Sequence, residues 1–134
     1  MTPEERGAFL EANRFCVVAY NRKSGPPAST PVYYVMDGED LLVSTQANRA
    51  KGRVLARNPE VSVCVLTENE PMPRYLTVYG HASIETEGAV ELMMRVGEKM
   101  TGAPIPESAR PTLEERAKRE QRVVLRITPE RHLP

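Results

Sequence analysis

The stretch LLVSTQANRAKGRVLARNPEVSVCV, residues 41–65, carries the pattern that decides the fold. It begins and ends with runs of β-branched and other apolar residues, which are typical of strands. Between these runs, over residues 46–57, apolar residues return at the spacing of one helix face. The Asn58-Pro59 pair ends that pattern because proline disfavours helical backbone in the residue before it. The stretch therefore predicts a strand, a short helix and a second strand.

Four cations, Arg49, Lys51, Arg53 and Arg57, crowd into this segment, although the whole chain has 18 basic and 18 acidic residues. A helix start presents unpaired N–H groups and a partial positive charge, so it can hold an anion. Lys51 falls in the predicted first turns, where it and Arg49 could fold back toward such an anion. The three arginines, spaced four residues apart, also suit a solvated helix face that pairs with surface carboxylates. The spacing alone is compatible with either interpretation.

The patterns in the rest of the sequence predict a mainly antiparallel β fold. The hydrophobic patterns predict strands over 14–20, 28–36, 40–45, 61–66, 75–84 and 122–128. They predict helices over 3–12, 46–57, 88–100 and 113–120. Asp37-Gly38 suits a tight hairpin, and two pairs of strands are joined by connections too short for a parallel crossover. We therefore expect a mainly β, α+β fold: a six-stranded antiparallel sheet that closes on itself, with short flanking helices, in one domain over residues 1–134.

The composition limits the kinds of partner. A formal net charge of zero provides no overall field to attract nucleic acid. No apolar run reaches the roughly 18 residues of a membrane span, and the N-terminus lacks the basic-then-apolar form of a signal peptide. Cys16 and Cys64 lie in apolar runs and are expected to be reduced core thiols, and no cysteine–histidine cluster suggests a metal site. We expect a soluble cytoplasmic protein.

Several parts of the chain together resemble a known family. The opening stretch, the overlapping GPPASTPVYYVMDGEDLLVST (25–45) and the later YLTVYGHASI (75–84) have the order and gaps of the split-barrel flavoproteins related to pyridoxamine-phosphate oxidase. RVVLRITPERH (122–132) looks like the last strand of that family. The TPVYY and YLTVYGHA forms are similar to the branch that uses the deazaflavin coenzyme F-420, which also holds members that bind FMN, haem or biliverdin. The resemblance implies a split β-barrel of the FMN-binding type.

The resemblance also implies which residues contact the cofactor. The strand matching Ser29 to Tyr34 runs along the cofactor ring in such proteins, and Lys51 matches a lysine on the cofactor phosphate. Tyr75 matches a position that reaches the cofactor, in related homodimers from the neighbouring chain. The implied cofactor contacts are Ser29, Thr30, Pro31, Val32, Tyr33, Ser44, Thr45, Lys51 and Tyr75, with Arg49 and Arg53 as further basic candidates.

The activity implied by the resemblance is hydride transfer between reduced F-420 and a small unsaturated or conjugated organic acceptor, in a homodimer. Ser29 stands where the pyridoxamine-phosphate oxidases have an arginine, and the chain has no tryptophan and lacks their C-terminal substrate segment, which argues against pyridoxamine-phosphate oxidation. Candidates for orienting a substrate are Tyr33, Tyr34, Tyr79 and His81, although outward tyrosines also serve in packing or interfaces, and a histidine as a polar partner. The alternatives are an FMN-dependent oxidoreductase of the same fold and a protein that binds a flavin or tetrapyrrole without turnover.

Overall fold

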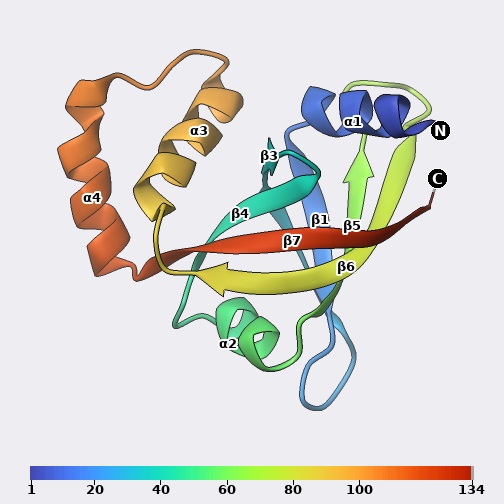
Figure 1. The fold of residues 1–134 in the computed structure, drawn as a ribbon, viewed down its shortest axis with the longest axis horizontal. Helices are drawn as coiled ribbons and strands as arrows, with labels where there is room; N and C mark the ends of the chain where they lie inside the picture. Colours follow the sequence, from blue (N-terminus) through green and yellow to red (C-terminus); the bar gives the residue numbers. More distant parts are fainter. Residues whose placement is uncertain (134) are drawn as a thin grey trace.

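The computed structural model describes residues 1–133, with side chains described for residues 1–130. Within that part, one sheet holds seven strands: β1 (Phe15–Tyr20), β2 (Ala28–Tyr33), β3 (Val35–Asp37), β4 (Asp40–Gln46), β5 (Glu60–Leu66), β6 (Tyr75–Glu85) and β7 (Arg122–Leu133). The helices of the same part are α1 (Pro3–Ala12), α2 (Ala50–Arg57), α3 (Ala89–Thr101) and α4 (Arg110–Arg119), and a 3-10 turn, η1 (Glu107–Ala109), precedes α4. Neighbouring strands are antiparallel in the order β2-β1-β5-β6-β7-β4-β3. The expected antiparallel α+β architecture is confirmed (Figure 1).

The sheet curls round because one continuous segment supplies both of its ends. β2 and β3 occupy opposite ends of the strand order, yet only Tyr34 separates them in the chain. The Tyr34 side chain is fully buried, its hydroxyl donates to the Leu10 carbonyl at 2.6 Å, and its amide donates to the Arg14 carbonyl at 3.1 Å. These contacts hold the bend by which the chain leaves β1 and joins β4. The prediction of one strand over 28–36 is therefore wrong, and the expected six strands are seven.

Alternation along the strands builds the core. On β6, the residues that face inward are buried, namely Leu76, Val78, Gly80 and Ala82. The intervening residues Tyr75, Thr77, Tyr79 and His81 lie on the outer side of the sheet. β1 and β5 alternate in the same way, so Cys16 lies in the core as expected. Cys64 points to the outer side, so the expectation of a core thiol is wrong there, and both cysteines are free.

Short-range signals fix two of the connections. Asp37 pairs with Asp40 across a two-residue loop that begins with Gly38, whose φ of +62° suits glycine. At the start of α1, the Glu5 amide donates to Thr2 Oγ1 at 3.1 Å, as expected for an N-cap. The predicted hairpin and the predicted first helix are both confirmed.

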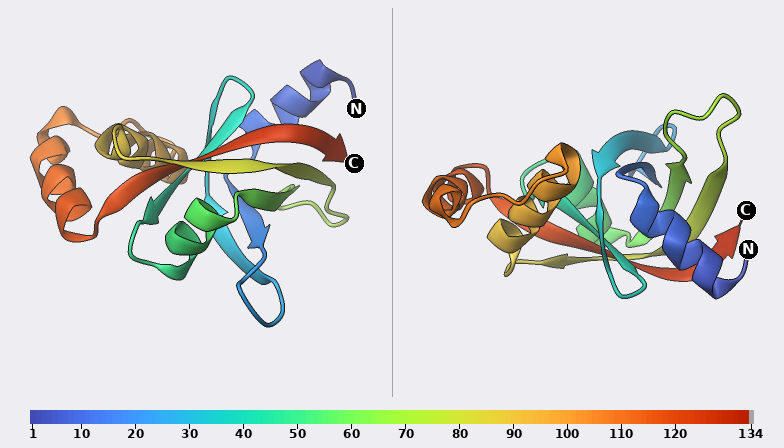
Figure 2. Two further views of the ribbon diagram at one scale, coloured as in Figure 1. Left: turned by 60° about the horizontal axis from the view of Figure 1, so that its bottom comes forward. Right: turned by 90° about the horizontal axis from the view of Figure 1, so that it is seen from above.

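The later helices differ at their starts from those predicted. α2 begins at Ala50 rather than at 46 because β4 continues through Gln46, which pairs with Arg122. α4 begins at Arg110 rather than at 113, directly after η1. The α3–α4 hairpin extends from one end of the sheet, α1 packs near the other, and α2 lies below β6 (Figures 1 and 2). No helix among the described residues is long and apolar enough to cross a membrane.

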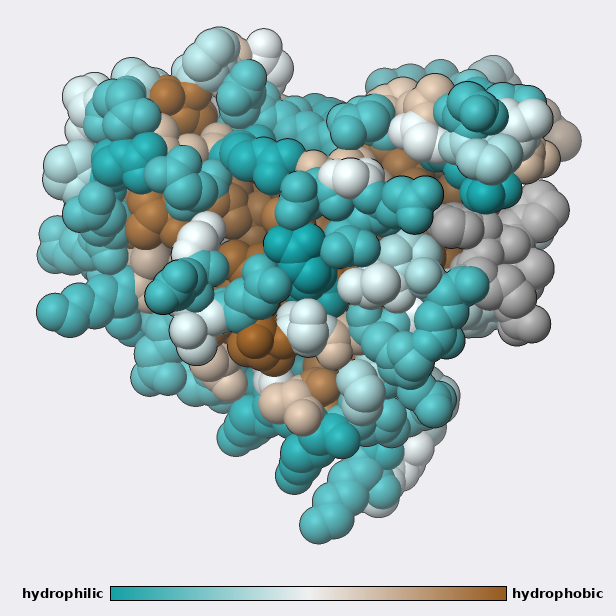
Figure 3. Space-filling view, in the orientation of Figure 1, coloured by the Kyte–Doolittle hydropathy of each residue, from teal (hydrophilic) through white to brown (hydrophobic). Residues whose placement is uncertain are grey.

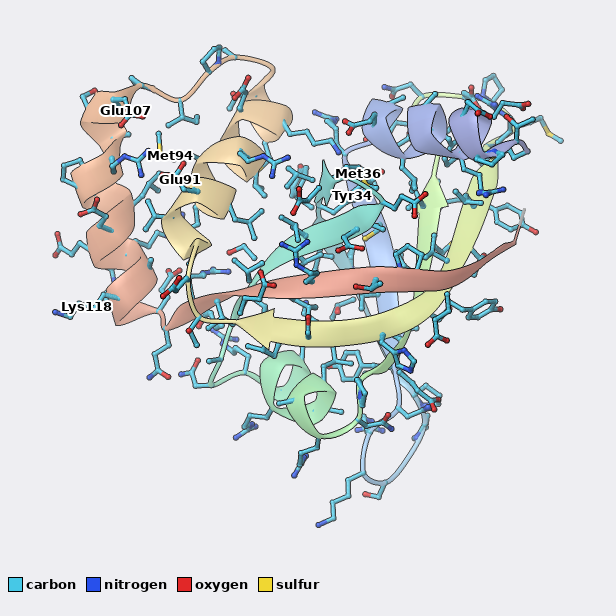
Figure 4. All side chains as sticks on the ribbon, viewed as in Figure 1. Tyr34, Met36, Glu91, Met94, Glu107 and Lys118 are labelled. Atoms are coloured by element: carbon cyan, nitrogen blue, oxygen red, sulfur yellow. The ribbon has the colours of Figure 1, made fainter. Side chains whose placement is uncertain are left out.

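Cations on α3 attach the hairpin to the edge strand β3. Lys99 Nζ donates to the Tyr34 carbonyl at 3.0 Å and lies 4.0 Å from the centre of its ring. Arg95 donates to the Met36 carbonyl at 2.6 Å. Figure 4 shows Tyr34 and Met36 at β3, between α3 and α1. These bonds satisfy carbonyls that an uncovered sheet edge would leave open to pairing with another chain.

Candidate functional site

Lys51 extends from the first turn of α2 to β2. Its ammonium nitrogen lies 3.5 Å from Thr30 Oγ1, and burial lowers its pKa, with the Arg122 guanidinium acting in the same direction. Cys16 is nearby, but burial raises the pKa of its thiol to about 12, so the thiol stays neutral. No carboxylate among the described side chains pairs with Lys51. Lys51 is therefore a partly desolvated cation without a counter-ion in the described part of the chain, which fits the binding of an anion.

Arg122, at the start of β7, is the second cation of this site, and no motif in the sequence pointed to it. The pairing of β7 with β4 brings its guanidinium to 3.5 Å from Ser44 Oγ. Its Nε donates to Glu120 at 2.8 Å, and Arg116 Nε donates to the same carboxylate oxygen at 3.1 Å. Lys51, Arg116 and Arg122 are called the basic cluster below. Among the described side chains, its three positive charges share a single paired carboxylate, Glu120.

An apolar cavity of about 410 Å³, the inter-helix cavity, lies beside this cluster, between the sheet and the α3–α4 hairpin. Its lining consists of Val32, Tyr33, Ser44, Met93, Val96, Gly97, Met100, Ile105, Ala109, Leu113, Arg116 and Arg122. Hydrophobic surface is visible between α3 and α4 in Figure 3. Cavities of this size with mostly apolar walls and a few convergent polar groups are typical small-molecule sites. The structure thus brings three of the predicted contacts, Val32, Tyr33 and Ser44, to one cavity.

A larger hollow of about 600 Å³ lies between α1 and the β5–β6 connection. It is more polar, and both of its arginines are already neutralised. Arg14 pairs with Glu68 at 2.7 Å, and Arg74 pairs with Glu70 at 3.1 Å. The hollow therefore offers an anion less than the basic cluster does, and the inter-helix cavity is the better candidate site.

Register divides the predicted residues of β2 between two faces. Thr30 and Val32 pair with the buried residues Val18 and Cys16, so they face the barrel interior. The residues on the outer face are Ser29, Pro31 and Tyr33. The Tyr33 ring makes an edge contact with the Phe15 ring at 6.0 Å between centroids. Tyr33 thus lies at the border between the outer face and the inter-helix cavity.

Three other predicted cofactor contacts, Thr45, Arg49 and Arg53, do not line the inter-helix cavity. Thr45 is buried and faces the barrel interior, on the opposite side of β4 from Ser44. Arg49 is exposed at the N-cap of α2 and donates to Gln46, and Arg53 is exposed and lines a different depression. Lys51 is therefore the one residue of the predicted basic segment that is both half-buried and directed to β2.

Three more predicted residues lie on the outer side of β6, away from the inter-helix cavity. Tyr75 is 51% exposed, and the His81 imidazole pairs with Glu130. Tyr79 lines a separate hollow beside Tyr20. Tyr34, the remaining tyrosine candidate, is buried and holds the bend between β2 and β3. Within a single chain, none of these four contributes to the described lining of the cavity.

The sequence profile of one family, described as pyridoxamine 5'-phosphate oxidase, matches residues 2–133. The chain belongs to the pyridoxamine 5'-phosphate oxidase family. The resemblance inferred from the sequence motifs is thereby confirmed. Among curated proteins, none matches the chain.

Solved structures share the fold of this family member. A conserved hypothetical protein from Mycobacterium tuberculosis superposes with a TM-score of 0.84 and 24% identity, over 98% of this chain and 82% of that one. An F-420 reductase superposes with a TM-score of 0.77 and 24% identity, over 98% of both chains. A FAD-binding protein from Mesorhizobium loti superposes with a TM-score of 0.66 and 22% identity, over 98% of this chain and 90% of that one. At these identities the similarity establishes the split-barrel fold and leaves the cofactor to be argued from the site.

Proposed function

We propose that this protein is an oxidoreductase that uses the deazaflavin coenzyme F-420 to reduce a small unsaturated or conjugated organic acceptor. The observation that carries the proposal is the basic cluster beside the inter-helix cavity. Lys51 has no carboxylate partner among the described side chains, and Arg122 and Ser44 lie at the cavity wall. Family membership and the similarity to an F-420 reductase support the choice of redox chemistry and of cofactor.

The donor set fits the phosphate of a flavin-type cofactor. An ammonium, a guanidinium and two hydroxyl groups come from Lys51, Arg122, Thr30 and Ser44. Phosphate oxygens accept charge-assisted hydrogen bonds from such groups, each contributing roughly 1.5–3 kcal/mol. β2 would lie along the cofactor ring and contact it largely through its backbone.

F-420, when bound, supplies the hydride, and the protein supplies position and shielding. Lys51 and Arg122 hold the cofactor's anionic end. Val32, Tyr33 and the apolar residues of α3 and α4 surround the reacting region and exclude water, which strengthens the electrostatic contacts inside it. No protein acid is assigned, because solvent can protonate the reduced acceptor.

A homodimer completes this proposal. The outer side of the sheet exposes Phe15, Leu66 and Tyr75, with relative exposures of 37%, 37% and 51%. Tyr33 adjoins Phe15 on the same side. We therefore propose that a second copy covers this surface, the outer aromatic face (Phe15, Tyr33, Leu66 and Tyr75), and that the second copy's tyrosine at position 75 reaches the cofactor.

Titration of the purified protein with F-420, FMN and haem, followed by absorption and fluorescence, tests the proposal. F-420 is expected to bind tightest, and its reduced form to be oxidised only when an organic acceptor from a panel of quinones and enones is present. If the protein binds FMN but not F-420, and the FMN-bound protein consumes oxygen rapidly, the FMN-dependent alternative is favoured. The similarity to a FAD-binding protein supports that alternative. Binding without turnover of any acceptor would favour a carrier protein.

A further inference from the structure

The lining of the inter-helix cavity falls into an apolar group of residues and a polar group, which are called its apolar end and its polar end below. One end is lined by aliphatic and methionine side chains of the hairpin, among them Met93, Met100, Ile105 and Leu113. Methionines adapt to irregular apolar ligands because their side chains are flexible and polarisable. The other end carries Arg116, Arg122 and the Ser44 hydroxyl. A cavity of this form suits an elongated apolar molecule with one polar end.

The polar end carries a positive charge that the described neighbouring groups do not balance. Arg116 and Arg122 both donate to Glu120, at 3.1 and 2.8 Å, so two guanidinium groups share one carboxylate. Arg122 is the less exposed of the two, with 18% of its side chain exposed against 48% for Arg116. Within residues 1–130, whose side chains the structure describes, no acidic residue lines the cavity itself. The sign of this charge selects an anionic ligand group over a neutral or cationic one.

Close packing and ion pairs join the elements of the hairpin that line the cavity. At Gly97 on α3, an added Cβ would lie 3.1 Å from the Ile105 side chain, so glycine lets the loop before η1 approach the helix closely. Arg110 of α4 pairs with Glu91 of α3 and with Glu107 of η1, so ion pairs join the two helices of the hairpin. Figure 4 shows Glu91 and Met94 between the two helices and Glu107 at the upper end of α4. These contacts join α3, η1 and α4 beside the cavity.

We infer that the inter-helix cavity binds an apolar carboxylate, with its carboxylate at Arg116 and its apolar body among Met93, Met100, Ile105 and Leu113. Arg116 is assigned to this ligand because Arg122, rather than Arg116, contacts Ser44, one of the donors assigned to the cofactor. The identification of this ligand as the acceptor in hydride transfer rests on the proposed function, whereas the binding site itself does not.

Isothermal titration of the cofactor-free full chain with octanoate and with octan-1-ol tests the inference. The two probes share an apolar chain and differ in charge. Octanoate is expected to bind at one site per chain and about tenfold or more tighter than octan-1-ol, as one charge-assisted contact predicts. Arg116→Gln should remove this preference and leave octan-1-ol binding unchanged. Lys118→Gln, which removes a charge from the outward side of the same helix (Figure 4), should change neither.

A second variant tests the apolar end. Ala109→Phe places a large ring in the cavity and should weaken both probes about tenfold or more. The inference is overturned if octanoate does not saturate a site, if it binds no tighter than octan-1-ol, or if Arg116→Gln keeps the preference. If the natural chain binds F-420 but not octanoate, the proposed carboxylate site is rejected and the proposed cofactor is not. If it binds octanoate but not F-420, the proposed cofactor is rejected and the carboxylate site is not.

Discussion

At the scale of single residues, Lys51 is the residue on which the proposed site depends. It is half-buried, it contacts Thr30, and the described side chains offer it no carboxylate. A lysine kept in this state costs stability, because burial disfavours its charged form. Such a cost is expected where a cation is held ready for a ligand. The arrangement has consequences for both binding and stability.

Lys51→Ala is expected to weaken F-420 binding about ten- to a hundredfold, because one charge-assisted contact of roughly 1.5–3 kcal/mol is lost. Arg57→Ala removes the same charge from the exposed last turn of α2 and should change binding far less. Fluorescence titration at low and high salt measures both, and the difference between the variants should shrink as salt screens the contact. Equal losses at Lys51 and Arg57 would mean that the segment acts only as a diffuse basic surface.

Lys51→Met is expected to raise the free energy of unfolding of the cofactor-free protein at pH 7. The pKa of Lys51 is lowered in the folded state, so between that value and the ordinary 10.5 the unfolded chain binds more protons than the folded one. The penalty is fully present below the lowered pKa and disappears as the pH rises toward 10.5. Urea unfolding at pH 7 and pH 10 should therefore show the advantage of the variant shrinking at the higher pH. A variant less stable than the natural chain at pH 7 would contradict this.

At the scale of elements, the β6–β7 pair depends on a glycine opposite a proline. The register shifts between Tyr79 and Gly80, where Gly80 pairs with Pro129. Proline has no N–H to donate, so the hydrogen bonds between the two strands are interrupted at this position and a bulge forms. The two backbones approach so closely there that an added Cβ on Gly80 would lie 2.3 Å from the Thr128 carbonyl oxygen. Backbone atoms cannot rotate away as a flexible side chain can.

Gly80→Ala is accordingly expected to destabilise the fold by about 1–3 kcal/mol, the usual range for overpacking. Gly7→Ala is the matched control, because Gly7 lies in α1 and a Cβ added there would have no atom within 4 Å. There the same substitution should stabilise by about 0.5–1 kcal/mol through helix propensity. Urea unfolding of both variants checks the opposite signs. A neutral Gly80→Ala would show that β7 can move away without cost.

At the scale of the whole molecule, the inward and outward sides of the sheet differ in burial. The inward side forms the core, whereas Phe15, Leu66 and Tyr75 on the outward side remain partly exposed. The α3–α4 hairpin covers the β3 edge of the sheet and meets the outer aromatic face only at Tyr33, which also lines the inter-helix cavity. The outer aromatic face is thus available for a second copy, as proposed above.

Light scattering of the natural chain is expected to give twice the mass of the 15.0 kDa polypeptide. Leu66→Lys places a charge in the outer aromatic face, so it should shift the protein toward the monomer and weaken F-420 binding together. Met72→Lys adds the same charge on the β5–β6 connection, where the methionine is 84% exposed, and should do neither. A natural chain that is monomeric at micromolar concentration and still binds the cofactor would reject the dimer.

The sequence by itself determined the features that depend on neighbouring residues. Alternation located β6 and its buried face, Gly38 marked the hairpin, and Thr2 marked the start of α1. The family motifs indicated the split-barrel fold, which the family match confirms, and they predicted Lys51 as a cofactor contact. These signals are legible because hydrophobic period, turn geometry and capping act over a few residues.

Only the tertiary structure decided how distant segments meet. Tyr34 divides one predicted strand into β2 and β3 through bonds to Leu10 and Arg14, which lie in other parts of the chain. The register of β7 on β4 brings Arg122 to Ser44, 78 residues away along the chain, and the α3–α4 hairpin closes the inter-helix cavity beside them. Such contacts are set by the packing of the whole core and by strand pairing across long loops, so no local pattern in the sequence encodes them.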